Sequence, residues 1–181
     1  MIRSQETTLA DELTGRADEN GVRFELTLPL RSRPQSGTLN NPTVLVASSD
    51  EKVLQKLAEI VVQCGLATFL AFSVYESKRI LNRREVCLVV CDDRLIDGKY
   101  DDILSETVQF VLKTPVIVVS PTGDWPDYLK ALNAGAFDYL AYPPIPGDLP
   151  QSIYNALTFR TARRHQEIAT KFFNTSGGGM L

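Results

Sequence analysis

The sequence predicts a parallel α/β fold in which helices cover both faces of one sheet. From Pro42 onward, short continuous apolar runs alternate with segments whose apolar residues recur every three or four positions. Runs of the first kind are typical of strands buried on both faces, and the second spacing is typical of amphipathic helices. Strands that alternate with helices along a chain indicate crossover connections and therefore a parallel sheet.

Five strand–helix units follow one another along the chain. Strands are expected at residues 44–47, 67–72, 86–91, 115–119 and 137–140, and helices at 53–64, 73–81, 103–112, 124–135 and from 149 into the 160s. The first helix has apolar residues at spacings of three and four, and Gly65 suits its C-terminal end. Ser73 and Glu76 have the spacing of a capping box, so they mark the start of the second helix.

The later units are marked by their ends. The third strand is the most apolar and stops abruptly at two aspartates, after which the third helix leads to the fourth strand at Pro115. The fourth helix begins with Asp124, has a proline in its first turn and stops at Gly135, so both of its ends are defined. A proline-rich run separates the fifth strand from the last helix.

The length and composition suit one domain with extensions. The chain has 181 residues, 44% of them hydrophobic and 23% charged, and a formal net charge of −3. Broad nucleic-acid binding would need clustered lysine and arginine, so no nucleic-acid partner is expected. No apolar run approaches the roughly 20 residues that cross a bilayer, and no secretory signal follows Met1. We expect a cytoplasmic protein that does not bind membranes.

The domain is expected at residues 42–160, between an N-terminal extension and linker at 1–41 and a helical extension with a flexible tail at 161–181. Within the first 41 residues, only Val22–Leu28 alternates between apolar and polar residues as a half-buried strand would. That stretch resembles the closing strand of a histidine-kinase ATP-binding domain. No nucleotide-binding glycine boxes precede it, so the chain is not expected to be a kinase.

Polar side chains gather where the predicted strands end. They are Ser48, Ser49 and Asp50 after the first strand, Asp92 and Asp93 after the third, Ser120 after the fourth and Tyr142 after the fifth. In open parallel sheets, ligands bind at the carboxyl ends of the strands. These side chains are therefore expected to line one pocket.

Three motifs in this order resemble the receiver domains of response regulators, of the chemotaxis-receiver type. Val90–Gly98 resembles the phosphoacceptor strand and its loop, Val116–Ser120 the strand that ends in Ser or Thr, and Ala134–Pro143 the Gly-Ala-x-Asp-Tyr-Leu-x-Lys-Pro run. The resemblance implies a flavodoxin-like, doubly wound (βα)5 fold with strand order 2-1-3-4-5. It also implies that Asp92 is the phosphoacceptor and Tyr139 the switch aromatic.

The sequence departs from the family at three of the pocket positions. Ser48 and Ser49 stand where the resemblance implies an acidic pair, and neutral hydroxyls are poor substitutes for the carboxylates that bind magnesium. Tyr142 stands at the lysine position, and a phenol cannot form a salt link to an acyl phosphate. Asp50 is predicted to cap the following helix, and Asp93 to be a solvated loop acid. We expect no cofactor, little or no magnesium binding and weakened phosphorylation.

The function implied by the resemblance is that of a non-enzymatic receiver module in two-component or phosphorelay signalling, with output through protein contacts. A sensor histidine kinase or another signalling protein is the expected partner. One alternative is a phosphorylation-independent pseudo-receiver that serves as a dimerisation or adaptor module. A second is a small flavodoxin-like enzyme with Cys91 or Asp92 as nucleophile. Cys91 ends an apolar strand, where a buried structural thiol is the usual outcome.

The last helix is expected to extend to about Phe173. Its apolar stripe would consist of Leu157, Ala162, Ile168 and Phe172, with Arg160, Arg163, Arg164 and Lys171 around it. Such a stripe can pair with another helix, so a homodimer through this helix is one hypothesis and a frayed, solvated tail is the other. His165 is expected at the surface. The three cysteines, Cys64, Cys87 and Cys91, lie in segments expected to be buried, and neither a disulfide nor a zinc site is supported.

Overall fold

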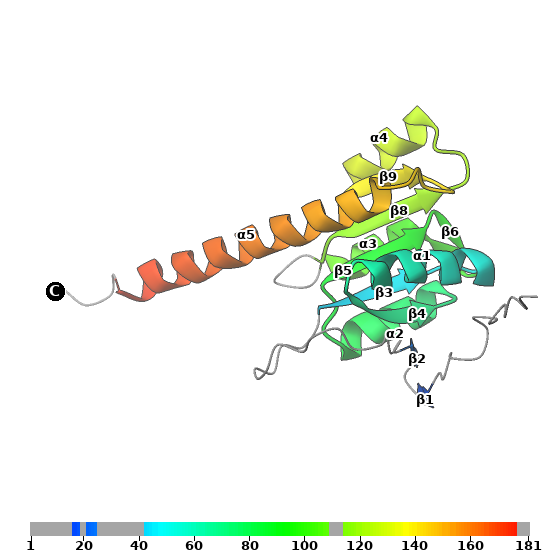
Figure 1. The fold of residues 1–181 in the computed structure, drawn as a ribbon. Helices are drawn as coiled ribbons and strands as arrows, with labels where there is room; N and C mark the ends of the chain where they lie inside the picture. The colour runs from blue at the N-terminus through cyan, green and yellow to red at the C-terminus, as the bar shows by residue number, and fades with distance from the viewer. Residues whose placement is uncertain (1–15, 19–20, 25–41, 109–113, 177–181) are drawn as a thin grey trace, which may run out of the picture.

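The computed structural model describes residues 16–18, 21–24, 42–108 and 114–176 (Figure 1). The strands are β1 (Arg16–Asp18), β2 (Gly21–Phe24), β3 (Thr43–Ala47), β4 (Ala67–Ala71), β5 (Leu88–Asp92), β6 (Arg94–Leu95), β7 (Gly98–Lys99), β8 (Val116–Ser120) and β9 (Asp138–Ala141). The helices are α1 (Glu51–Gln63), α2 (Val74–Arg83), α3 (Tyr100–Thr107), α4 (Trp125–Ala134) and α5 (Asp148–Ser176).

The main sheet has the order β1-β2-β4-β3-β5-β8-β9, in which β4-β3-β5-β8-β9 are parallel. Numbered along the five parallel strands, this is 2-1-3-4-5, so the predicted fold is confirmed. The sheet is wider than predicted, because β2 pairs antiparallel with β4 and β1 pairs with β2. The strand predicted at 22–28 corresponds to β2 over its first residues, and residues 25–28 lie outside the described part.

Both faces of the sheet are covered by helices. Buried side chains of α1 and α5 form one cluster with the sheet, here called the α1/α5 cluster, and those of α2, α3 and α4 form another. Val46 and Val90 belong to the α1/α5 cluster, whereas Leu45 and Val89 belong to the cluster on the other face. Successive strand residues point to opposite faces, so Val44–Ala47 of β3 and Leu88–Cys91 of β5 are continuous apolar runs.

The helix ends follow the predicted signals with two differences. Ser73 accepts a hydrogen bond from the Glu76 amide at 3.1 Å, and Gly135 ends α4 with φ 105°. Asp124 lies at the predicted N-cap, but its side chain makes no capping hydrogen bond. Helix α3 starts three residues earlier than predicted, because Asp102 accepts the Lys99 amide at 3.0 Å. Residues 109–112 of that predicted helix lie outside the described part.

Helix α5 begins on the sheet and then leaves it, so that its C-terminal half projects from the domain (Figure 1). Leu149, Ile153 and Ala156 are buried against the sheet. Beyond Arg160 the side chains that the structure describes are exposed or half-buried. No helix within the described ranges is long and apolar enough to span a bilayer.

Cysteine burial was predicted correctly at two of three positions. Cys87 and Cys91 are buried, but Cys64 is exposed. Cys64 is the C-cap of α1, where the chain leaves the helix before the Gly65 turn. A position at a helix end faces solvent even when the apolar spacing continues through it.

Candidate functional site

Ser48 and Asp92 form the centre of the predicted pocket. Ala47 of β3 is paired with Cys91 of β5, so the residues that follow them emerge side by side at the carboxyl edge of the sheet. The Ser48 side chain is fully buried, and its Oγ donates a hydrogen bond to Asp92 Oδ2. Ser48 stands where the family resemblance implies a metal-binding acid. Its hydroxyl is instead bonded to the carboxylate of the expected phosphoacceptor, Asp92.

The Asp92 carboxylate is electrostatically perturbed. Burial is the largest cause and raises its pKa to about 6, the Ser48 hydrogen bond acts in the opposite direction, and the charges of Asp93 and Asp50 raise the pKa further. None of these groups that shift the Asp92 pKa is a cation. A carboxylate in this setting gains a proton far more readily than an exposed one.

The Ser49 hydroxyl is bonded to the backbone of two loops. Its Oγ donates to the Phe72 carbonyl at 3.1 Å and accepts the Ile96 amide at 2.6 Å. Phe72 follows β4, and Ile96 lies in the turn between β6 and β7. Ser49 thus ties together two loops that surround the pocket, a role that the sequence reasoning did not anticipate.

Asp50 caps α1, as predicted. Its carboxylate accepts the amides of Lys52 at 2.8 Å and Val53 at 3.2 Å. These are the free amides of the first helical turn, which an N-cap side chain satisfies. The carboxylate oxygen that accepts both amides faces the helix.

Asp93 differs from the prediction of a solvated loop acid. It is half-buried, and its Oδ2 accepts the Ser120 hydroxyl at 3.1 Å. The Ser120 Oγ also lies 3.1 Å from the hydroxyl of Thr122, a residue that the sequence reasoning missed. Ser120 is the last residue of β8, which pairs with β5 so that Val119 lies opposite Asp92. This pairing brings the side chains of Ser120 and Asp93 together.

Tyr142 follows β9 at the far side of the pocket. Its backbone amide donates to the Ser120 carbonyl at 2.8 Å, and its ring packs against the α1/α5 cluster. The ring is therefore partly used as a core side chain.

Tyr139 is buried and belongs to an aromatic series that reaches the surface. Its ring meets Tyr128 edge to face, with centroids 6.5 Å apart, and Tyr128 stacks on Trp125 at 5.2 Å. Trp125 is 68% exposed. The series connects the expected switch aromatic to the outer surface of α4.

Asp97 lies in the turn between β6 and β7, within the loop that follows the phosphoacceptor strand. Its carboxylate accepts the amides of Val74 at 2.6 Å and Tyr75 at 2.9 Å, so it caps α2 from a distant loop. The slight burial of Asp97 raises its pKa, but the hydrogen bonds from the Tyr75 and Val74 amides together lower it by more and hold the pKa below its usual value. No local spacing predicts this contact, because the partners lie more than twenty residues apart.

Neither metal binding nor thiol chemistry is favoured by the geometry. Within the described ranges, no group of three or more His, Cys, Asp or Glu side chains is placed to hold a metal ion. Burial, followed by the charges of Asp92 and Asp93, raises the pKa of the Cys91 thiol far above its usual value. The nucleophile is the thiolate, so Cys91 is a structural thiol.

The chain is similar to bacterial response regulators over most of its α/β part. It is 34% identical over 112 residues to the response regulator protein PilR of Pseudomonas aeruginosa, a stretch that covers 61% of this chain and 25% of PilR. The chain thus spans about a quarter of the length of that relative. No model of a protein family matches the sequence.

Solved receiver domains have the same fold. A response regulator receiver domain protein from Clostridium thermocellum is 26% identical, with a TM-score of 0.62 over 67% of this chain and 98% of that one. The beryllofluoride-activated NtrC4 receiver domain, solved as a dimer, is 21% identical, with a TM-score of 0.60 over 65% of this chain and 98% of its own. The fold of the chain therefore agrees with that of solved receiver domains.

Proposed function

We propose that this chain, whose α/β domain is a receiver domain of the response-regulator type, acts in two-component signalling through protein contacts and with little control by phosphorylation. The proposed partner is a sensor histidine kinase or another signalling protein in the cytoplasm. In this proposal residues 42–160 form the receiver, residues 1–41 an N-terminal extension, and residues 161–181 an extension of the last helix.

The proposal rests on the hydrogen bonds that the pocket hydroxyls of Ser48 and Ser49 already make within the protein. Phosphoryl transfer to a carboxylate builds up negative charge, which magnesium and a cationic side chain normally compensate. Ser48 is bound to Asp92, and Ser49 is engaged by two loops. Asp50 caps a helix, and Tyr142 packs into the core. These contacts support a pocket whose side chains maintain structure instead of binding a metal.

A phosphoryl group on Asp92 would have few partners here. It would add charge beside Asp93, while the Ser48 hydroxyl that donates to Asp92 is neutral. A modification shifts a conformational equilibrium only through interactions that differ between the two states. We therefore take Asp92 as the acceptor position and expect its phosphorylation to change the conformation of Tyr139 little.

The proposed contact surface is the face formed by β8, α4 and β9. Trp125 is 68% and Leu129 43% exposed there. Trp125 stacks on Tyr128, which in turn meets the buried Tyr139 edge to face. Ala131 is the buried residue of α4. An exposed tryptophan that stacks on a half-buried tyrosine is the kind of anchor residue that protein interfaces use.

Labelling by a small phosphodonor tests the proposal. The intact protein is incubated with acetyl phosphate and magnesium, and the phosphorylated fraction is measured by mass spectrometry. We expect little label on the natural chain and more on the triple variant Ser48→Asp, Ser49→Asp, Tyr142→Lys, which restores the charges together. Adding Asp92→Asn to the triple variant is the control and should remove the label. Efficient, magnesium-dependent labelling of the natural chain would overturn the proposal.

A further inference from the structure

Three large apolar side chains are exposed beside the Asp92 pocket. Phe72 is 42%, Tyr75 65% and Ile96 82% exposed. Phe72 follows β4, Tyr75 lies in the first turn of α2, and Ile96 lies in the turn between β6 and β7. We call these three residues the Ile96 patch.

Hydrogen bonds hold the residues of the Ile96 patch close together. The Ser49 hydroxyl donates to the Phe72 carbonyl at 3.1 Å and accepts the Ile96 amide at 2.6 Å. The next residue of the same loop, Asp97, accepts the Tyr75 amide at 2.9 Å. Single exposed apolar side chains are common on protein surfaces, whereas a contiguous group marks a contact site. The Ile96 patch is therefore a candidate contact site.

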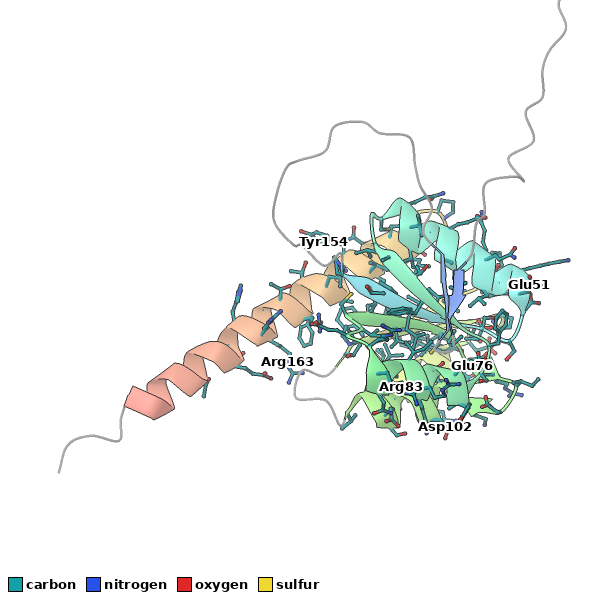
Figure 2. The ribbon with its side chains drawn as sticks, turned by 90° about the horizontal axis from the view of Figure 1, so that it is seen from below. Glu51, Glu76, Arg83, Asp102, Tyr154 and Arg163 are labelled. Carbon is teal, nitrogen blue, oxygen red and sulfur yellow. The ribbon has the colours of Figure 1, made fainter. Side chains whose placement is uncertain are left out.

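The backbone beneath the patch is fixed in the free protein. Glu76 accepts the Phe72 amide at 2.7 Å, and Ser73 caps the helix that carries Tyr75. A partner that binds preorganised loops loses less free energy to ordering them. Figure 2 shows Glu76 and Glu51, at the starts of α2 and α1, on the side of the domain away from the projecting end of α5. That end of α5 leaves the patch uncovered.

The pocket next to the patch is negatively charged. Ser48, which is bonded to Asp92, directly precedes Ser49, so the pocket and the patch adjoin. Asp92 and Asp93 are both half-buried and partly accessible to solvent. The groups that shift the Asp92 pKa include the carboxylates of Asp93 and Asp50 and no cation. A partner on the patch therefore meets uncompensated negative charge at one end.

The other end of the patch is basic. The Arg79 guanidinium lies 5.8 Å from the centre of the Tyr75 ring. Helix α2 starts after β4 and runs away from the carboxyl edge of the sheet, so Arg79 lies one turn farther from the pocket than Tyr75 does. The charge on the surface thus changes sign along the patch, which fixes the direction in which a charged partner can bind.

We propose that the Ile96 patch docks a protein segment that presents an apolar side chain beside a lysine or arginine, with that cation at Asp92 and Asp93. The apolar side chain covers Ile96, and the cation supplies the positive charge that Tyr142 does not. Opposite charges attract more strongly where a contact excludes water. An acidic segment would be repelled by the same two carboxylates.

Docking at the patch rests on the proposed function in one respect, that the chain acts through protein contacts. The patch belongs to elements other than β8, α4 and β9, so it is a second contact surface. Its occupant is defined by chemistry, an apolar residue next to a cation. Peptide binding is measured without a phosphodonor, so a failure of docking would leave the outcome of the labelling experiment unchanged.

Peptide display on the intact chain tests the docking. A library of short linear peptides is selected on the protein, and the Kd of each enriched peptide is measured by fluorescence anisotropy. We expect these peptides to carry an apolar residue close to a lysine or arginine. Ile96→Ser and Tyr75→Ala should each raise the Kd by at least about tenfold. Val108→Ser, a 55% exposed position at the C-terminal end of α3, is the matched control and should leave the Kd unchanged.

A double-substitution cycle tests the position of the cation. Replacing the lysine or arginine of a peptide with glutamine should raise its Kd for the natural chain by at least about tenfold. The same replacement should matter little for the variant Asp92→Asn, Asp93→Asn, because no charge remains for the cation to meet. Glu85→Gln, an exposed acid between α2 and β5, is the control and should behave as the natural chain does. Urea unfolding checks that each variant is folded.

Three results would overturn the proposal. The first is a selection that enriches no peptide, or only acidic ones. The second is an enriched set whose Kd is unchanged in both Ile96→Ser and Tyr75→Ala. The third is an equal effect of the glutamine replacement on the natural chain and on the variant without the two carboxylates.

Discussion

The substitution Asp92→Asn is expected to stabilise the protein at neutral pH. Burial is the main reason that the Asp92 pKa is raised from 3.8 to about 6 in the folded state, and Asp93 and Asp50 add to it. As pH rises, the unfolded chain releases this proton first, so the folded state loses stability between about pH 4 and pH 6. Asparagine keeps an oxygen that can accept the Ser48 hydroxyl but carries no charge.

The size of the effect follows from the pKa difference. One pKa unit corresponds to about 1.4 kcal/mol, so the change from 3.8 to about 6 sets an upper value of about 3 kcal/mol. Asp92 is half-buried, and solvent screening reduces this value. We expect a gain of about 1 to 2 kcal/mol at pH 7.5 and almost none at pH 3.5.

Urea unfolding of both proteins at a series of pH values measures this gain. Asp97→Asn is the control, because the Asp97 pKa is lowered by the α2 amides that it caps. Its stabilising contribution is present above its unfolded pKa and is lost as pH falls through the folded one, so the substitution should destabilise at pH 7.5. If Asp92→Asn destabilises at pH 7.5, or its gain is the same at pH 3.5, the reasoning about a buried, uncompensated carboxylate is wrong.

Two further outcomes are expected. The natural chain should show no magnesium binding at sub-millimolar concentration by titration calorimetry, because Ser48 and Ser49 supply no charge; binding that Asp92→Asn abolishes would contradict this. Ser49→Ala should cost about 1 kcal/mol and speed hydrogen exchange at the Ile96 amide, because that amide loses its partner. Ser105→Ala, which removes an exposed hydroxyl on α3, is its control. Equal exchange of the Ile96 amide in both variants would show that Ser49 does not hold the two loops together.

The parallel core was predictable because its signals are local. Each strand is a short apolar run, and each helix has its own spacing and end residues, as the Asp50 and Ser73 caps show. The pocket position followed as well, since parallel strands end at one edge. These features depend on residues within a few positions of one another.

What was missed depends on contacts between distant residues. The Asp97 cap of α2, the Ser49 tie between two loops and the Asp93 bond to Ser120 join segments that lie far apart in the chain. The pairing of β2 with β4 is of the same kind. Local spacing identifies a polar side chain at a loop, but its partner is set by how the strands are arranged.

The response of Trp125 to a phosphoryl mimic tests the central claim most directly. Trp125 is the single tryptophan of the chain, and it reaches the buried Tyr139 through Tyr128, so its fluorescence reports on the proposed contact face. Addition of beryllofluoride with magnesium is expected to leave the emission of the natural chain unchanged, as in Asp92→Asn. A saturable, magnesium-dependent change that disappears in Asp92→Asn would show that the pocket still controls that face.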